Sequence, residues 1–173
     1  MAVFTRAAGA GLLITDEGAK YLLNCIFKLG TRPVTLVLTL LGHLSTPITS
    51  LSDTDVDMST LQGVDAASWS SVTGGTSTGD SVYVLCSAAN APTVVGDVPV
   101  ITWPVITYNF VDGGAKVNGG AFGATIYGYQ ILSAQDPTNV LFEELFATPF
   151  KPTIAGDVLR LTLQIQLGNG TPA

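Results

Sequence analysis

Ser77 has surroundings that match a catalytic motif. It lies at the centre of Gly75-Thr76-Ser77-Thr78-Gly79, which has the G-x-S-x-G form of a hydrolase nucleophile elbow. That chemistry needs a strand-to-helix turn and a histidine that accepts the serine proton. The residues that follow, Val82 to Cys86, are typical of a strand, and the only histidine, His43, precedes the serine. We therefore interpret the motif as a Gly/Ser/Thr loop.

Three alternating carboxylates form a second candidate site. Asp53, Asp55 and Asp57 match the opening of a calcium loop, whose sixth residue is glycine and whose twelfth is a bidentate glutamate. Those two places hold Met58 and Val64. The same alternation fits a short edge strand with one solvated face, so we favour a solvated surface over a calcium site.

The other reactive side chains form no convergent set. Glu143 and Glu144 are neighbours in an expected strand and therefore point to opposite faces, so they cannot act on one bond. His43 has no cysteine or carboxylate at a ligand spacing, and Cys25 and Cys86 are far apart, which excludes an ordinary Cys/His zinc site. A disulfide between these cysteines stays open. The sequence predicts no catalytic residue, no metal site and no cofactor.

The secondary structure is predicted to be mainly β, with one helix near the N-terminus. Apolar residues recur at helical spacing between Asp16 and Leu29, Thr15 can cap the start, and Gly30 suits the end. Six later segments are rich in β-branched and aromatic residues and are predicted as strands. They are Val34 to Leu41, Ser81 to Ser87, Val98 to Phe110 with an interruption at Pro104, Ala124 to Ser133, Val140 to Thr148, and Asp157 to Leu167.

The last of these strands has the clearest pattern. Leucine and isoleucine alternate with polar residues, which predicts that four apolar side chains face the core: Leu159, Leu161, Leu163 and Ile165. Short strands with turn-rich connections indicate a β-sandwich or jelly-roll-like domain with one N-terminal amphipathic helix. We expect an extended arm over residues 1–14 and a single domain over residues 15–173, with the helix at 16–29.

Composition limits the classes of function. Charged residues make up 12% of the chain against about 25% in ordinary proteins, and the mean hydropathy is +0.44. A net charge of -6 disfavours nucleic-acid binding, which needs basic side chains. The longest apolar run, Val34 to Leu41, is too short for a membrane-spanning helix, and the N-terminus lacks the form of a secretory signal. A surface so poor in charge indicates a protein that functions in an assembly.

Two segments are predicted to make the intermolecular contacts. The arm carries apolar residues without an evident local partner, and the loop from Asp112 to Gly123 is rich in glycine, which permits close approach to another backbone. The alternative is that both segments are only mobile. The candidate interface residues are Val3, Phe4, Leu12, Leu13, Gly113, Gly114, Gly119 and Gly120.

The chain resembles small virion structural proteins of tailed bacteriophages, of the capsid cement or decoration type. The resemblance spans most of the chain and rests on short, non-catalytic motifs. They are Leu12-Leu13-Ile14, Glu17-Gly18, Leu22-Leu23, Ile126-Tyr127-Gly128-Tyr129, Leu141-Phe142-Glu143-Glu144-Leu145-Phe146, and Gly156-Asp157 with Leu159, Leu161 and Leu163.

This resemblance implies a non-enzymatic protein on the capsid surface that bridges major-capsid subunits. It also implies assembly in the cytoplasm of a host bacterium and self-association, with a trimer preferred. The alternative is a tail-fibre or receptor-binding module that recognises glycans. Such a module needs exposed aromatic side chains beside Asn, Asp or Gln in a groove, so burial of Trp69 and Trp103 would remove it.

Overall fold

The computed structural model describes residues 3–5, 13–14, 35–45, 61–85, 93–95, 98–134 and 136–166. Within these ranges every regular element is a strand, apart from one short 3-10 helix, η1 (Ala66–Ser68). The predicted mainly β character is therefore confirmed. The predicted helix at 16–29 lies outside the described residues.

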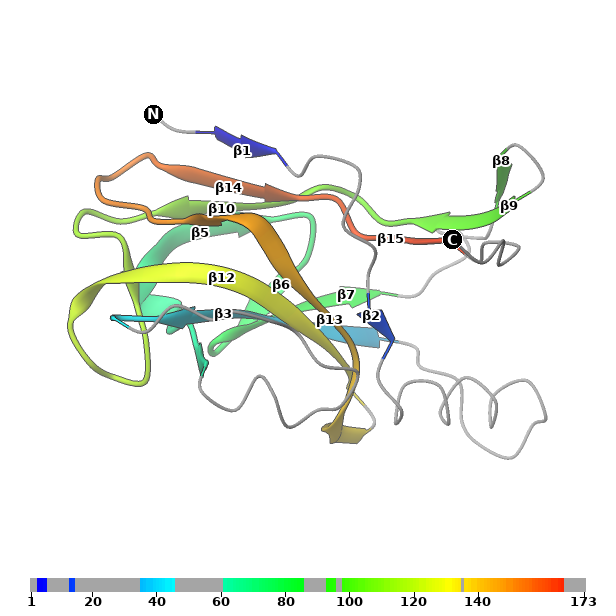
Figure 1. The fold of residues 1–173 in the computed structure, drawn as a ribbon, viewed down its shortest axis with the longest axis horizontal. Helices are drawn as coiled ribbons and strands as arrows, with labels where there is room; N and C mark the ends of the chain where they lie inside the picture. Colours follow the sequence, from blue (N-terminus) through cyan, green and yellow to red (C-terminus); the bar gives the residue numbers. More distant parts are fainter. Residues whose placement is uncertain are drawn as a thin grey trace.

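Two sheets form the body of the molecule as two layers (Figure 1). The strands of the four-stranded sheet follow in the order β1 (Val3–Thr5), β14 (Val158–Leu161), β10 (Ile106–Phe110) and β5 (Trp69–Thr73). The main path of the eight-stranded sheet is β2 (Leu13–Ile14), β13 (Asp136–Phe150), β12 (Phe122–Ser133), β3 (Thr35–His43), β7 (Ser81–Leu85) and β6 (Thr76–Thr78). Two short strands complete it, β4 (Gln62–Gly63) beside β3 and β11 (Ala115–Lys116) beside β12.

A third, smaller sheet continues two strands of the four-stranded sheet. It consists of β15 (Gln164–Gln166), β9 (Val98–Thr102) and β8 (Thr93–Val95). The predicted interruption at Pro104 separates β9 from β10 and is confirmed. The strand predicted from Asp157 to Leu167 is divided into β14 and β15, and there the Trp103 amide donates a hydrogen bond to the Leu163 carbonyl at 3.0 Å.

One apolar core lies between the two layers. It unites side chains from both sheets, including Leu38 and Leu40 of β3 with Tyr108 and Phe110 of β10. The predicted alternation near the C-terminus is confirmed for three residues, because Leu159, Leu161 and Leu163 are buried and the residues between them are exposed. The side chain of Ile165 is outside the described part.

The β12–β13 pair is irregular at a position where only glycine fits. The register shifts between Ile126 and Gly128, and Gly128 then pairs with Leu145. A β carbon added at Gly128 would lie 2.0 Å from the Glu144 carbonyl oxygen, which is far inside contact distance. The close approach of these two backbones therefore depends on the missing side chain.

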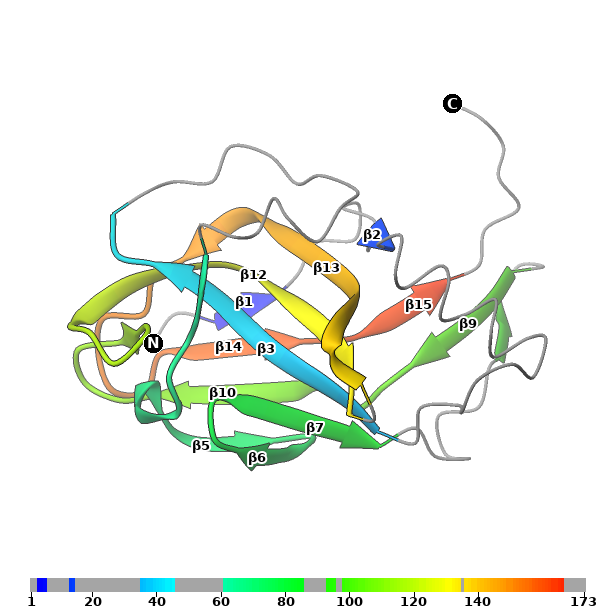
Figure 2. The same ribbon diagram turned by 90° about the horizontal axis from the view of Figure 1, so that it is seen from below.

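The two sides of the layered body are closed differently. On one side β5 and β6, the last strands of the two sheets, are joined directly through the turn at Gly74 and Gly75. Figure 2 shows β5 and β6 together at the lower margin and β13 at the opposite margin. On that opposite side the outermost strands are β1 and β2, both from the N-terminal segment. The sequence did not predict β5 or β6, because both are rich in Ser and Thr, β6 buries no side chain, and Trp69 is the one fully buried residue of β5.

Candidate interaction surface

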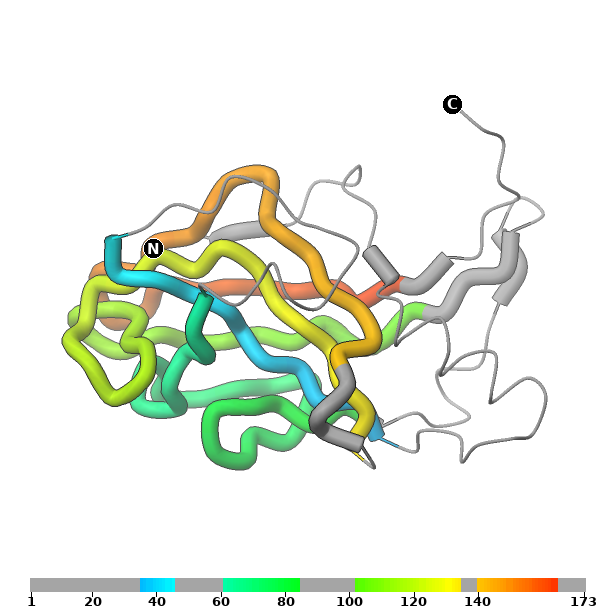
Figure 3. The backbone as a smooth tube through the Cα atoms, turned by 60° about the horizontal axis from the view of Figure 1, so that its bottom comes forward, coloured from blue at the N-terminus to red at the C-terminus, as the bar shows by residue number. Residues whose placement is uncertain are grey.

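Three connecting segments meet at one end of the two sheets, and we call this region the loop end. It consists of residues 43–45, 111–123 and 151–157, at the left of Figure 3. The Gly113 amide donates to the Thr153 carbonyl at 3.3 Å, and the Gly156 amide donates to the Phe110 carbonyl at 3.1 Å. Backbone hydrogen bonds thus join the segment after β10 to the turn before β14.

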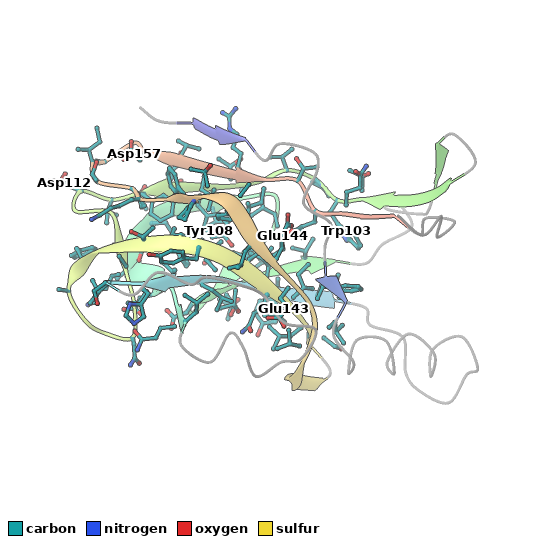
Figure 4. The ribbon with its side chains drawn as sticks, viewed as in Figure 1. Trp103, Tyr108, Asp112, Glu143, Glu144 and Asp157 are labelled. Atoms are coloured by element: carbon teal, nitrogen blue, oxygen red, sulfur yellow. The ribbon has the colours of Figure 1, made fainter. Side chains whose placement is uncertain are left out.

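Asp157 orders the turn between β13 and β14. Its side chain is buried, and Oδ2 accepts hydrogen bonds from the amides of Thr153 at 2.8 Å and Ile154 at 3.3 Å. Figure 4 shows Asp157 at the loop end, close to the exposed Asp112 in that view. An aspartate that accepts hydrogen bonds from backbone amides stabilises a turn, so Asp157 has a structural role.

Exposed apolar side chains are concentrated at the loop end. In the described part of the chain four large hydrophobic residues are exposed, and three of them, Leu44, Phe122 and Ile154, belong to this region at 45–50% exposure. The Lys116 ammonium lies 5.9 Å from the centroid of the Phe122 ring. The loop end therefore presents apolar surface with a cation beside it, as contact surfaces often do.

The predicted glycines of this region have two different roles. Gly113, Gly119 and Gly120 are exposed, as a contact loop requires. Gly114 is buried with φ +82°, and a β carbon there would lie 1.9 Å from the Pro152 carbonyl oxygen. Gly114 therefore permits packing within its own chain and offers no surface to a partner.

The predicted arm is paired with its own chain where it is described. Val3 and Phe4 belong to β1 and are the register partners of Val158 and Leu159, and Leu13 in β2 pairs with β13. These strands add to the outer edges of β13 and β14, which offer backbone hydrogen-bonding groups to an added strand. The side chains of the arm lie outside the described part, so the expectation that they lack local burial stays a prediction. Leu12 lies outside the described residues, and the role of the arm as an interface stays a prediction.

An open polar pocket of about 390 Å³ adjoins the loop end. It is lined by Gln62, Gly63, Asp65, Asp80, Asn118 and Gly119. Asp65 Oδ2 accepts from the Gly119 amide at 2.8 Å, and Asp80 Oδ1 accepts from the Ala66 amide at 2.6 Å. Both carboxylates therefore order neighbouring loops. No group of three or more potential metal ligands occurs within the described ranges.

The two adjacent glutamates are buried, which the sequence analysis missed. Glu143 and Glu144 pair with Gln130 and Tyr129 respectively, on consecutive positions of β12 and β13. The Tyr129 hydroxyl donates a hydrogen bond to Glu144 Oε2. A signal was present, because Glu144 alternates with Phe142 and Phe146, which are apolar and share its strand face.

The interpretation of the serine motif as a loop is wrong for its central residues, because Thr76–Thr78 pair with β7 as strand β6. Ser77 lies in the exposed strand β6, which is followed by strand β7 instead of a helix. His43 Nδ1 accepts a hydrogen bond from the Ser45 amide at 3.0 Å. The aspartates at positions 53, 55 and 57, and both cysteines, lie outside the described residues.

Both tryptophans are buried. Trp69 is 8% exposed and meets Tyr108 edge-on at 5.1 Å between ring centroids, and Trp103 is 5% exposed. Burial also raises the pKa of Tyr108 above its ordinary value. These aromatic rings therefore serve core packing in the described structure and form no exposed stacking platform.

Comparisons with known proteins give no family assignment. No protein-family model, no curated protein and no solved structure matches the chain. Within the described ranges, no helix is long and apolar enough to cross a membrane.

Proposed function

We propose that the chain is a virion structural protein of the capsid cement type, which binds the major capsid protein and bridges its subunits through non-covalent contacts. In this proposal the two layers form a jelly-roll-like β-sandwich, and copies of the chain associate with one another, a trimer being the preferred state. The low content of charged residues supports a role inside an assembly. The resemblance to phage decoration proteins supports the capsid as the location.

The observation that carries the proposal is the apolar loop end. Leu44, Phe122 and Ile154 expose roughly half of their surfaces beside turns held by backbone hydrogen bonds. A contact surface supported by ordered turns loses little conformational freedom on binding. Many such weak contacts on one lattice reinforce each other through avidity.

The test measures how many copies of the protein are present in purified virus particles whose genome encodes it. We expect Phe122→Asp to reduce the occupancy at least tenfold without a change in the unfolding midpoint, because Phe122 is exposed. Val105→Asp is the matched control, since Val105 is equally exposed but lies away from the loop end. Equal occupancy for both variants would contradict the proposed contact surface, and absence of the protein from particles would contradict the proposed function.

The adhesion module expected from exposed tryptophans is removed by their burial, and the polar pocket is the separate observation that favours glycan binding without them. Its Asp, Asn and Gln side chains are of the type that binds sugar hydroxyls. Burial of Trp69 and Trp103 removes the stacking platform that this function was expected to use. A glycan array separates the two functions, because a capsid cement protein is expected to bind no glycan. If a glycan binds in the pocket, Gln62→Ala should weaken its binding.

A further inference from the structure

The N-terminal strands lie at the outer edges of the two sheets, on the side opposite the β5–β6 turn. The strand β1 is the outermost strand of the four-stranded sheet, next to β14, and β2 is the outermost strand of the other sheet, next to β13. On the opposite side β5 and β6 are joined by a two-glycine turn. In Figure 1, β1 and β2 lie apart from each other, each beside its own sheet.

The pairing of β1 differs from that of the other described strands. β1 runs parallel to β14, whereas every other strand pair in the described part is antiparallel. Only three residue pairs hold it, from Val3↔Val158 to Thr5↔Arg160. Removal of β1 would leave all the other pairs intact and would expose the outer edge of β14. An exposed edge of this kind accepts a strand from another molecule.

Charge favours the N-terminal segment as that incoming strand. Residues 1–14 contain one basic side chain, Arg6, and no acidic one. The rest of the chain contains six Lys or Arg residues and all 13 Asp and Glu residues. Two copies of the acidic body repel each other, whereas the N-terminal segment carries the opposite charge and adds nothing to the repulsion between acidic bodies.

We propose that the outer edge of β14 is a strand-exchange site, at which Val3–Thr5 of a second copy replaces the chain's own β1. The exchanged strand makes the same backbone contacts and the same register pairs as the strand it replaces, so exchange sacrifices no contact of the closed form. Each exchanged strand links one copy to another. This inference concerns self-association alone and does not depend on a capsid.

Cross-linking between two variants tests the exchange directly. Thr5 and Arg160 are register partners, and Arg160 is exposed. One full-length chain carries Thr5→Cys and another carries Arg160→Cys, both with Cys25→Ser and Cys86→Ser. After unfolding and refolding together, oxidation is expected to yield a disulfide-linked heterodimer. The control mixture pairs Thr5→Cys with Thr162→Cys, because Thr162 is exposed but lies beyond the paired residues.

We expect at least five times more linked dimer from the test mixture than from the control mixture. A single chain with both Thr5→Cys and Arg160→Cys shows whether β1 occupies the β14 edge at all. If that chain links only within monomers and the test mixture gives no more dimer than the control, the strand stays in its own chain and the proposal is overturned. That outcome leaves the proposed capsid contact at Phe122 unaffected.

A peptide experiment covers the case in which the cysteine variants fail to fold. The probe is a labelled peptide of residues 1–11, added to the chain that lacks residues 2–11 and to the full-length chain. We expect the shortened chain to bind at least tenfold more tightly, because its β14 edge is open, and Phe4→Asp in the peptide to remove the binding. Equal binding to both chains, or none to a folded shortened chain, would overturn the proposal.

Discussion

The Tyr129 hydroxyl donates a hydrogen bond to the Glu144 carboxylate across the β12–β13 pair, in the interior between the two sheets. Both side chains are 1% exposed, and the Tyr129 ring lies 6.0 Å from the Phe146 ring. A buried carboxyl group is costly unless hydrogen bonds compensate for the lost water. This pair therefore joins β12 to β13 beside the irregular pairing at Gly128.

Removal of the Tyr129 hydroxyl is expected to destabilise the fold. Tyr129→Phe keeps the ring but takes one hydrogen bond from a buried carboxyl group, which costs about 1–3 kcal/mol of unfolding free energy. Urea denaturation followed by circular dichroism measures this loss. Tyr127→Phe is the matched control, because Tyr127 is only partly buried, and it should change the stability by less than about 0.5 kcal/mol.

A double-mutant cycle isolates the interaction between the two side chains. Glu144→Leu removes the buried carboxyl group to which the Tyr129 hydroxyl donates its hydrogen bond. The effects of Tyr129→Phe and Glu144→Leu should therefore differ from additivity by about 0.5–3 kcal/mol. Additive effects would show that the hydrogen bond contributes nothing to stability.

The sequence predicted the strands that bury a regular pattern of apolar residues. Leu159, Leu161 and Leu163 alternate with polar residues, and alternation has one physical explanation, a strand with one buried face. The break at Pro104 was also predictable, because proline lacks the amide that a sheet requires.

The remaining features depend on contacts between distant parts of the chain. Pairing of Val3 with Val158 joins residues from the two ends, and no local pattern in either segment encodes it. Strand β6 buries nothing, so its composition resembles that of a loop. The exposed loop end arises because three separate turns meet, and Leu44, Phe122 and Ile154 are unremarkable residues in the sequence alone.

Truncation of Leu161 tests the predicted core-facing register. Its side chain is 1% exposed within the main apolar cluster, so Leu161→Ala should cost about 2–5 kcal/mol of unfolding free energy. Thr162→Ala, at the neighbouring exposed position, should change it by less than about 0.5 kcal/mol. Urea midpoints of the two variants measure the contrast, and similar effects would contradict the register.

Substitution of Gly114 tests the packing beneath the loop end. Gly114 has φ +82°, and an added β carbon would lie 1.9 Å from the Pro152 carbonyl oxygen, so the backbone must move. Gly119 also has a positive φ, +68°, but nothing lies within 4 Å of its added β carbon. Gly119→Ala should cost about 1–2 kcal/mol from backbone strain alone. Gly114→Ala should cost at least about 1 kcal/mol more, and equal thermal stability of the two variants would contradict the close approach.

Burial of Tyr108 predicts a loss of stability at alkaline pH. Desolvation raises the pKa of Tyr108 in the folded protein, whereas a tyrosine in the unfolded chain has a pKa of about 10. Below that pH both states are neutral and the stability is fully present. Above it the unfolded chain releases a proton that the folded chain retains, so the unfolding free energy falls by up to about 1.4 kcal/mol per pH unit.

Tyr108→Phe removes the ionisable group and keeps the ring that packs against Trp69. The variant should therefore show a shallower decline than the natural sequence when urea midpoints are measured from pH 8 to pH 11.5, with little difference between the two at pH 8. Other tyrosines contribute equally to both proteins, so the difference between the two curves reports Tyr108. Parallel curves over the whole range would mean that the Tyr108 hydroxyl ionises as readily in the folded chain as in the unfolded one, and that the ring is not held in the dry interior between the sheets.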